Sequence, residues 1–384
     1  MGDSGTFDSM ARIALNGRLL VPGKLEGIGR FTLTTFRGLV SRRPNDQFLL
    51  VVDRPHDDLF NLGPNVEVRR IRIPARRPWL IRWWFAGPLR RVLRDWKADA
   101  FVSTEGPLAT SMPPDFPQMT VIHDLNFEHR PDDLPKRWSS FYWLMFPRYA
   151  RLAKVLGTVS EFSKGDLAQS YELEASDIRG FSNAADDAFV PATDAERTHA
   201  QTRLTGGHPY FIFVGSFHPR KNLGGVMDAF EHYVEQGGQW HLVMVGEAMW
   251  SGEAMTKGVS DRVHFTGRLN DATLISAVGG ASGMIFVPWF EGFGVPVIEA
   301  MSCGVPVIAS EVTSLPEVCG GAAFAMVDPA DTIGIAQAML QLEQDEAAAL
   351  EASKKGMGRA RDFSWTQTVE AFDAAVDELL NAQP

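Results

Sequence analysis

Two glutamates stand eight positions apart on either side of a glycine-containing loop, a spacing that suits recognition of a sugar. Glu291 lies on the loop, and Glu299 lies in a helix that we expect to begin at Pro296, where proline costs little. Gly292 and Gly294 allow the backbone to approach a ligand closely. The positive end of such a helix binds anions, and the carboxylates can accept hydrogen bonds from sugar hydroxyls. The alternative is an ordinary strand, loop and helix that carry a surface glutamate.

A pair of cationic side chains occupies a similar position earlier in the same half of the chain. The segment 213–230 has the pattern of a strand, a loop and a helix, and Arg220 and Lys221 fall where the loop meets the helix. Two cations next to helix N–H groups suit a diphosphate. Cations at a helix N-terminus are electrostatically disfavoured without an anion, which argues against a purely structural role.

The first half of the chain carries weaker signals of the same kind. Gly27 and Gly29 lie at a strand-to-helix turn, and a plain tight turn explains them as well as a ligand loop does. His123 and Asp124 follow an apolar run that ends at the same predicted sheet edge. A histidine in this position is more often a packing or capping residue, so its functional interpretation depends on the phosphate site predicted in the other half.

Several other chemistries have no motif in this sequence. It contains no G-x-x-x-x-G-K-[ST] loop, no H-E-x-x-H and no C-x-x-C, and no Asp-x-Asp follows a predicted strand as a metal clamp. We therefore expect no metal and no other cofactor, so that Arg220, Lys221 and helix dipoles would carry the charge of a departing diphosphate. Two cysteines, Cys303 and Cys319, exclude a disulfide framework, and Cys303 is predicted to be a small core residue.

Short apolar runs alternate with longer amphipathic stretches in the first half, which predicts a parallel, doubly wound sheet. We expect strands at 11–17, 47–53, 99–106, 119–124 and 154–160, and helices at 27–43 and 137–153. The rhythm is lost from about 182 to 209, where a polar connection with one helix is predicted.

The same rhythm restarts in the second half, with strands expected at 209–217, 241–247, 262–269, 281–289 and 304–310. The chain of 384 residues is too long for one ordinary core. We predict two α/β domains of similar type, 1–190 and 205–362, and a terminal helix at 365–384 that crosses back to the first domain.

The distribution of charge is uneven. The net charge of −10 disfavours nucleic acid as a partner, yet the segment 69–97 carries ten basic residues and one acid. Five aromatic residues are interleaved with these bases: Trp79, Trp83, Trp84, Phe85 and Trp96. A basic and aromatic stretch is typical of a segment that lies on an anionic membrane surface. A solvated helix face with some core tryptophans is an equally good explanation.

In combination, these motifs resemble those of retaining GT-B glycosyltransferases of family 4. The strongest similarity is E-G-F-G-V-P-V-I-E at 291–299, an E-x7-E motif, with P-R-K-N-L at 219–223 and C-G-V-P-V-I-A-S at 303–310. G-I-G-R-F at 27–31 and V-I-H-D-L at 121–125 extend it into the first half. One departure is Ser216, because many relatives have an arginine at that position in a V-G-R motif.

The resemblance implies a GT-B fold, in which two facing Rossmann-like domains with parallel sheets enclose an interdomain cleft. It also implies transfer of a sugar from a nucleoside diphosphate sugar, with retention of the anomeric configuration. The implied catalytic residues are Arg220, Lys221, Glu291 and His123. The implied donor-binding residues are Gly27, Gly29, Ser216, Gly292, Phe293, Gly294, Val295 and Glu299.

Within the family, the sequence looks most like bacterial mannosyltransferases of surface-polysaccharide assembly. This similarity predicts transfer of mannose from GDP-mannose to a lipid-linked saccharide or polysaccharide, in the cytoplasm or at the inner face of the cell membrane. The alternatives are another UDP-, dTDP- or GDP-sugar donor, a GT-B epimerase or phosphorylase, and a noncatalytic nucleotide-sugar-binding scaffold.

Overall fold

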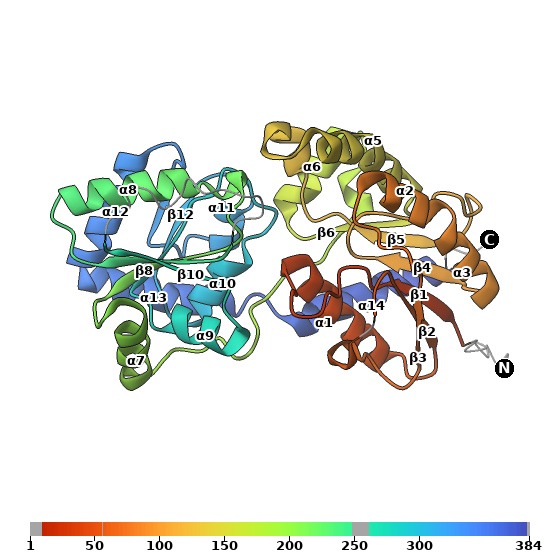
Figure 1. Cartoon of the computed structure of the whole chain (residues 1–384), viewed down its shortest axis with the longest axis horizontal. Coiled ribbons are helices and arrows are strands. Elements are labelled where there is room, and N and C mark those ends of the chain that lie inside the picture. Colours follow the sequence, from red (N-terminus) through yellow and green to blue (C-terminus); the bar gives the residue numbers. More distant parts are fainter. Residues whose placement is uncertain (1–9, 56, 248–260, 382–384) are drawn as a thin grey trace, which may run out of the picture. The chain divides into compact units, whose positions relative to one another are not determined.

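The chain folds into two compact units, each built on its own parallel sheet (Figure 1). A computed structural model describes residues 10–55, 57–247 and 261–381. The first unit runs to Val159 and adds Ser163–Phe181 and the segment from Trp365 onward. The second unit takes Ser160–Phe162 and Ser182–Ser364. The polar connection from Ser182 groups with the second unit, whereas the boundary predicted from the sequence lies at 190.

The first unit contains a seven-stranded sheet with the order β3-β2-β1-β4-β5-β6-β7, and every pair of neighbours is parallel. Its strands are β1 (Arg12–Asn16), β2 (Gln47–Val52), β3 (Val66–Arg70), β4 (Ala100–Ser103), β5 (Gln118–Val121), β6 (Val155–Thr158) and β7 (Ile178–Gly180). Its helices are α1 (Gly27–Arg42), α2 (Pro78–Ala86), α3 (Pro88–Trp96), α4 (Asn126–His129), α5 (Lys136–Leu152), α6 (Glu161–Tyr171) and α14 (Trp365–Asn381).

The second unit contains a six-stranded parallel sheet with the order β10-β9-β8-β11-β12-β13. Its strands are β8 (Tyr210–Val214), β9 (His241–Val245), β10 (Val263–Gly267), β11 (Gly283–Phe286), β12 (Val307–Ser310) and β13 (Ala325–Val327). Its helices are α7 (Asp194–Thr205), α8 (Leu223–Glu235), α9 (Asp271–Gly279), α10 (Val295–Ser302), α11 (Leu315–Cys319), α12 (Thr332–Gln344) and α13 (Glu346–Ala360). The predicted α/β fold with parallel sheets is confirmed in both halves.

Both sheets are covered on two faces, which explains their long apolar runs. In the first unit, Ala14, Leu49 and Phe101 face a core shared with α2, α3 and α5. In the second unit, the strands pack on α8 and α12, which lie side by side (Figure 1). Strands buried on both faces need apolar residues at successive positions, whereas a half-exposed strand would alternate apolar and polar residues. Among the helices in the described residues, none has the length and apolar character needed to cross a membrane.

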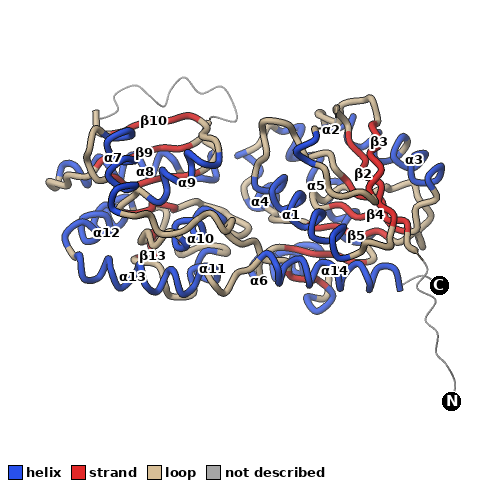
Figure 2. The backbone as a smooth tube through the Cα atoms, turned by 90° about the horizontal axis from the view of Figure 1, so that it is seen from below, coloured by secondary structure: helices blue, strands red, loops and turns tan. Residues whose placement is uncertain are grey.

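The C-terminal helix α14 belongs to the first unit, where it packs along α1 (Figure 2). Phe372 is fully buried, and its ring lies 6.5 Å from Phe31, 6.4 Å from Phe36 and 5.2 Å from Phe181 between ring centroids. Asp373 accepts a hydrogen bond from Arg43 Nε at 2.5 Å, next to this aromatic cluster. The cluster packs α14 against α1 and against Phe181, which follows β7.

We expect Phe372→Ala to destabilise the first unit by about 3–5 kcal/mol, because it removes a fully buried ring and leaves a cavity. Urea unfolding followed by circular dichroism measures this loss. Gln367→Ala, at an exposed position of the same helix, is the control and should leave the unfolding midpoint unchanged. Equal midpoints for Phe372→Ala and the wild type would show that α14 does not stabilise this unit.

Candidate active site

The second sheet reverses its strand order between β8 and β11. Strands β9 and β10 extend from one side of β8, and β11 to β13 extend from the other side. Open parallel sheets bind ligands beyond the carboxyl ends of their strands at such a reversal. Arg220 and Lys221 follow β8, and Glu291 follows β11, so the sequence-predicted cations and one predicted glutamate meet at this point.

A short 3₁₀ turn, Pro219–Lys221, holds the two cations in place. Asn222 follows the turn with a φ of 58° and caps α8. The Asn222 side chain is buried and donates hydrogen bonds to the carbonyl oxygens of Val287 at 3.1 Å and Pro329 at 2.8 Å. An asparagine tolerates this left-handed conformation better than most residues, so it can anchor the turn to two other loops.

The Glu291 carboxylate joins the two cations into one cluster. Its Oε2 atom accepts a hydrogen bond from Arg220 Nη1 at 2.6 Å and another from Lys221 Nζ at 2.5 Å. Arg220 Nη1 also donates to the Phe290 carbonyl oxygen at 3.0 Å, and Lys221 Nζ lies 4.6 Å from the centre of the Phe286 ring. We call Arg220, Lys221 and Glu291 the cationic cluster.

The cationic cluster is largely removed from water. The exposed fractions of the side chains are 21% for Arg220, 7% for Lys221 and 12% for Glu291. Burial by itself raises the pKa of Glu291, but the charges of Arg220 and Lys221 outweigh it, and the pKa lies below its usual value. The carboxylate is therefore ionised at neutral pH and is shared by two cations.

The loop that carries Glu291 is fixed by two residues that the sequence analysis did not select. Thr313 Oγ1 accepts a hydrogen bond from the Glu291 N–H at 3.2 Å. Ser314 Oγ donates to the carbonyl oxygens of Glu291 at 2.9 Å and Phe293 at 3.1 Å. Gly294 has a φ of 103° at the start of α10, and a Cβ there would lie 2.6 Å from Leu315. Glycine is therefore required at this position for both conformation and space.

The remaining predicted donor residues of the second unit lie around this loop. Gly292 is buried, and Phe293 is 3% exposed with its ring 5.3 Å from that of Phe363. Val295, the first residue of α10, is half-buried. Ser216 follows β8, and its carbonyl oxygen accepts a hydrogen bond from the His218 N–H at 2.8 Å. Contacts of these residues with a donor stay predictions.

Glu299 lies further along α10, where it is half-buried. Its charge acts on Cys303, one turn along the same helix, and burial together with this charge raises the pKa of the Cys303 thiol to about 12. Cys303 is 3% exposed, so the predicted core role of this cysteine is confirmed. The ribose-binding role of Glu299 stays a prediction.

The two glycines at the start of α1 differ in their surroundings. Gly27 is exposed, and no atom lies within 4 Å of the position that a Cβ would take. Gly29 is buried, and a Cβ there would lie 2.9 Å from the Leu19 carbonyl oxygen. Gly29 is thus needed for close packing. Gly27, at a helix end without a side-chain cap, leaves room for a ligand at the backbone.

His123 follows β5, and a hydrogen bond from its ring fixes the orientation of the side chain. Its Nε2 atom lies 2.9 Å from the Thr104 carbonyl oxygen, and its ring packs edge-on against Phe31 with 5.0 Å between centroids. Burial lowers the pKa of His123 below its usual value. The neutral ring therefore donates from Nε2 to Thr104, which leaves Nδ1 as a hydrogen-bond acceptor.

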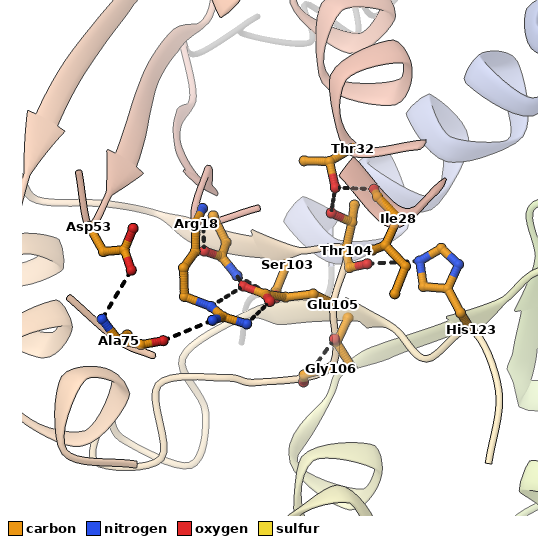
Figure 3. A network of polar contacts seen from close by, with 12 residues as sticks. Arg18, Ile28, Thr32, Asp53, Ala75, Ser103, Thr104, Glu105, Gly106 and His123 are labelled. Carbon is orange, nitrogen blue, oxygen red and sulfur yellow. Dashed lines mark hydrogen bonds and ion pairs between the residues drawn. The ribbon is translucent and has the colours of Figure 1, made fainter. Parts of the chain in front are cut away.

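A buried polar network lies at the carboxyl ends of β1 and β4, and the sequence analysis missed it (Figure 3). Arg18 Nε donates to Glu105 Oε1 at 2.8 Å, and a second guanidinium nitrogen pairs with Glu105 Oε2. Asn16 Nδ2 donates to Glu105 Oε1 at 2.7 Å, and Arg18 Nη1 donates to the Ala75 carbonyl oxygen at 3.0 Å. The available signal was Arg18, directly after the strand predicted at 11–17, and Glu105, near the end of the strand predicted at 99–106.

Comparison with known proteins also divides the chain into two parts. Residues 25–189 match the family described as Glycosyltransferase Family 4, and residues 194–359 match Glycosyl transferases group 1. The O-antigen chain mannosyltransferase B of Escherichia coli is 30% identical over 265 residues, which cover 66% of this chain and 69% of that protein. The chain belongs to glycosyltransferase family 4.

Solved structures place this family 4 glycosyltransferase in the GT-B fold. Sucrose-phosphate synthase from Thermosynechococcus elongatus has a TM-score of 0.78 and 17% identity, and the match covers 97% of this chain and 100% of that chain. Anabaena HepE in complex with UDP-glucose has a TM-score of 0.72 and 15% identity, with 95% and 99% covered. At these identities, the likeness concerns the fold alone.

Because burial depresses the pKa of His123, we expect its ring in this glycosyltransferase to stay neutral, with the proton on Nε2, down to about pH 6.5, the usual histidine value. Long-range ¹H–¹⁵N NMR of the imidazole nitrogens measures the tautomer and the titration. A proton on Nδ1, or a ring that is already positively charged at pH 7, would contradict this assignment. The pKa of His123 is lower in the folded chain than in the unfolded chain. His123 therefore contributes to stability at pH values above its unfolded-state pKa, and this contribution is lost as the pH falls through its folded-state pKa.

Proposed function

We propose that this family 4 glycosyltransferase moves a hexosyl group from a nucleoside diphosphate sugar to a saccharide acceptor, and that Arg220 and Lys221 receive the departing diphosphate. The observation that carries this proposal is the pair of cations on one buried carboxylate beyond β8 and β11. The ends of a parallel sheet at a strand-order reversal are where phosphorylated ligands bind.

The cluster can supply the charge stabilisation that sugar transfer requires. Negative charge grows on the diphosphate as the glycosidic bond breaks, and preorganised cations in a partly desolvated site stabilise that charge strongly. Arg220 offers a planar group with several donors, and Lys221 offers a compact charge. We propose that the diphosphate takes over the hydrogen bonds that Glu291 now accepts, and that the freed carboxylate turns to the sugar hydroxyls. In this proposal no metal ion is needed.

We propose that transfer proceeds with retention by displacement on the face of the leaving group. A backside mechanism with retention would need a carboxylate nucleophile next to the anomeric carbon. In this proposal Glu291, the carboxylate of the cationic cluster, turns to the sugar hydroxyls when the diphosphate displaces it, so it is not the nucleophile at the anomeric carbon. The departing phosphate itself can accept the proton of the acceptor hydroxyl. Proton NMR of the first product formed distinguishes retention from inversion.

For the donor we propose GDP-mannose, and for the acceptor a lipid-linked saccharide or polysaccharide. The support is the similarity to a protein named O-antigen chain mannosyltransferase B. HepE, which shares the fold, was solved with UDP-glucose, so a nucleoside diphosphate sugar suits this architecture. Another GDP-, UDP- or dTDP-sugar is the alternative donor.

Lys221→Ala should lower kcat by about a hundredfold or more, because it removes a positive charge from the site where the leaving group becomes negative. Its melting temperature should stay near that of the wild type, since Arg220 still pairs with Glu291. Lys354→Ala, at an exposed position of α13, is the matched control and should transfer sugar at the wild-type rate. Unchanged turnover in Lys221→Ala would remove the basis of the proposed mechanism.

A donor panel tests the second part of the proposal. GDP-mannose should raise the melting temperature of the wild type more than UDP-glucose, dTDP-glucose or ADP-glucose does, because a ligand that binds only the folded state stabilises it. Sugar transfer should continue in the presence of EDTA, as the cationic cluster replaces a metal. A larger rise in melting temperature with another nucleotide sugar would identify that sugar as the donor instead. Loss of sugar transfer in EDTA would contradict the metal-independent mechanism.

A further inference from the structure

Exposed tryptophans gather on two helices of the first unit. Within the part of the chain that the structure describes, every exposed tryptophan lies on α2 or α5: Trp79 is 63% exposed, Trp83 is 46% and Trp143 is 67%. Leu144, next to Trp143, is 47% exposed. Large apolar side chains in water are unfavourable, and their concentration on neighbouring helices marks an interaction surface.

The two helices are packed against each other. Ile81, Trp84 and Phe85 of α2 belong to the same buried cluster as Met145 and Phe146 of α5, and both figures of the whole chain show the helices next to one another (Figures 1 and 2). Arg82, between the exposed tryptophans of α2, and Arg148, one turn beyond Leu144, both act electrostatically on the hydroxyl of Tyr149. The exposed parts of α2 and α5 therefore form one region.

This region is strongly basic. The α5 sequence contains Lys136, Arg137, Arg148 and Arg151, all of them exposed, and it contains no acidic residue. The chain from Val68 to Arg94 also contains no acid, and Arg76 and Arg77, just before α2, are exposed. Basic side chains around exposed tryptophans are the combination that binds the headgroup region of an anionic bilayer.

The structure corrects the sequence-based view of the segment 69–97. Trp84, Phe85 and Trp96 are core residues, with exposed fractions of 0%, 0% and 6%. The exposed residues of α3 and its C-cap are all charged: Arg90, Arg91, Arg94, Asp95 and Lys97. Only α2 supplies exposed aromatic side chains from this segment, and α5 supplies a second set that the sequence analysis did not connect with it.

We propose that Trp79, Arg82, Trp83, Trp143, Leu144 and Arg148, which we call the α2–α5 surface, dock this protein on an anionic lipid bilayer. The three tryptophans and Leu144 enter the interfacial layer, because indole rings favour that depth. The arginines bind the lipid phosphates, since guanidinium groups match phosphate geometry. The proposal concerns binding to the lipid surface and does not depend on the identity of the sugar donor.

Co-sedimentation of the full chain with vesicles tests the proposal. The wild type should bind vesicles of phosphatidylcholine with 30% phosphatidylglycerol and should not bind pure phosphatidylcholine. Arg82→Gln with Arg148→Gln should weaken binding by about 25-fold, as each basic residue near an anionic surface contributes about fivefold. Trp79→Ser with Trp83→Ser and Trp143→Ser should weaken it at least tenfold, although it changes no charge.

The matched control is Arg90→Gln with Arg94→Gln on α3, which removes the same charge from a helix without exposed aromatic residues. It should weaken vesicle binding less than threefold. All the substituted side chains are exposed, and equal melting temperatures verify that each variant is folded. If the control variant binds vesicles as weakly as the α2–α5 variants do, the overall basic charge of the first unit, and not this surface, binds lipid. No binding to anionic vesicles, or equal binding to neutral ones, would overturn the proposal and point to a protein partner instead.

Discussion

The burial of charge at the end of β8 and β11 constrains the rest of the second unit. A lysine that is only 7% exposed is costly unless an opposite charge and good hydrogen bonds compensate it, and Glu291 provides both for Lys221. This compensation requires the loops after β8 and β11 to keep fixed positions relative to each other. Asn222 therefore ties the turn after β8 to the Val287 carbonyl, and Thr313 and Ser314 hold the backbone around Glu291. The sheet supplies the rigid frame from which both loops start.

The two units share the same reversal of strand order and a similar pairing of charges next to it. In each sheet the strand order reverses beside the first strand of the unit, between β1 and β4 in one and between β8 and β11 in the other. A cation after the first of these strands meets a glutamate after the second, as Arg18 with Glu105 and as Lys221 with Glu291. Arg18 pairs with Glu105 and the Ala75 carbonyl, whereas in the second unit one glutamate, Glu291, is shared by two cations. This pair of cations is the reason we propose the second unit as the one that binds the diphosphate.

The central strands and the long helices could be predicted from the sequence because both faces of each sheet are covered. Two-sided burial leaves unbroken apolar runs such as Phe48–Val52. β3, β7 and β13 were missed because they are edge strands with few fully buried residues. The cations and Glu291 were found from loops that carry glycine and proline. Thr313, Asn16 and Arg18 were missed, since their roles depend on partners that are distant in sequence, which no local pattern encodes.

The central claim is that Arg220 and Lys221, held in the free protein by Glu291, form the diphosphate site of this glycosyltransferase. A crystal structure of the complex with a nucleoside diphosphate tests it most directly. The account predicts that the terminal phosphate lies within hydrogen-bond distance of both Arg220 and Lys221, and that Glu291 no longer accepts from both cations. A diphosphate bound elsewhere, with the Arg220–Glu291 and Lys221–Glu291 pairs intact, would contradict the account.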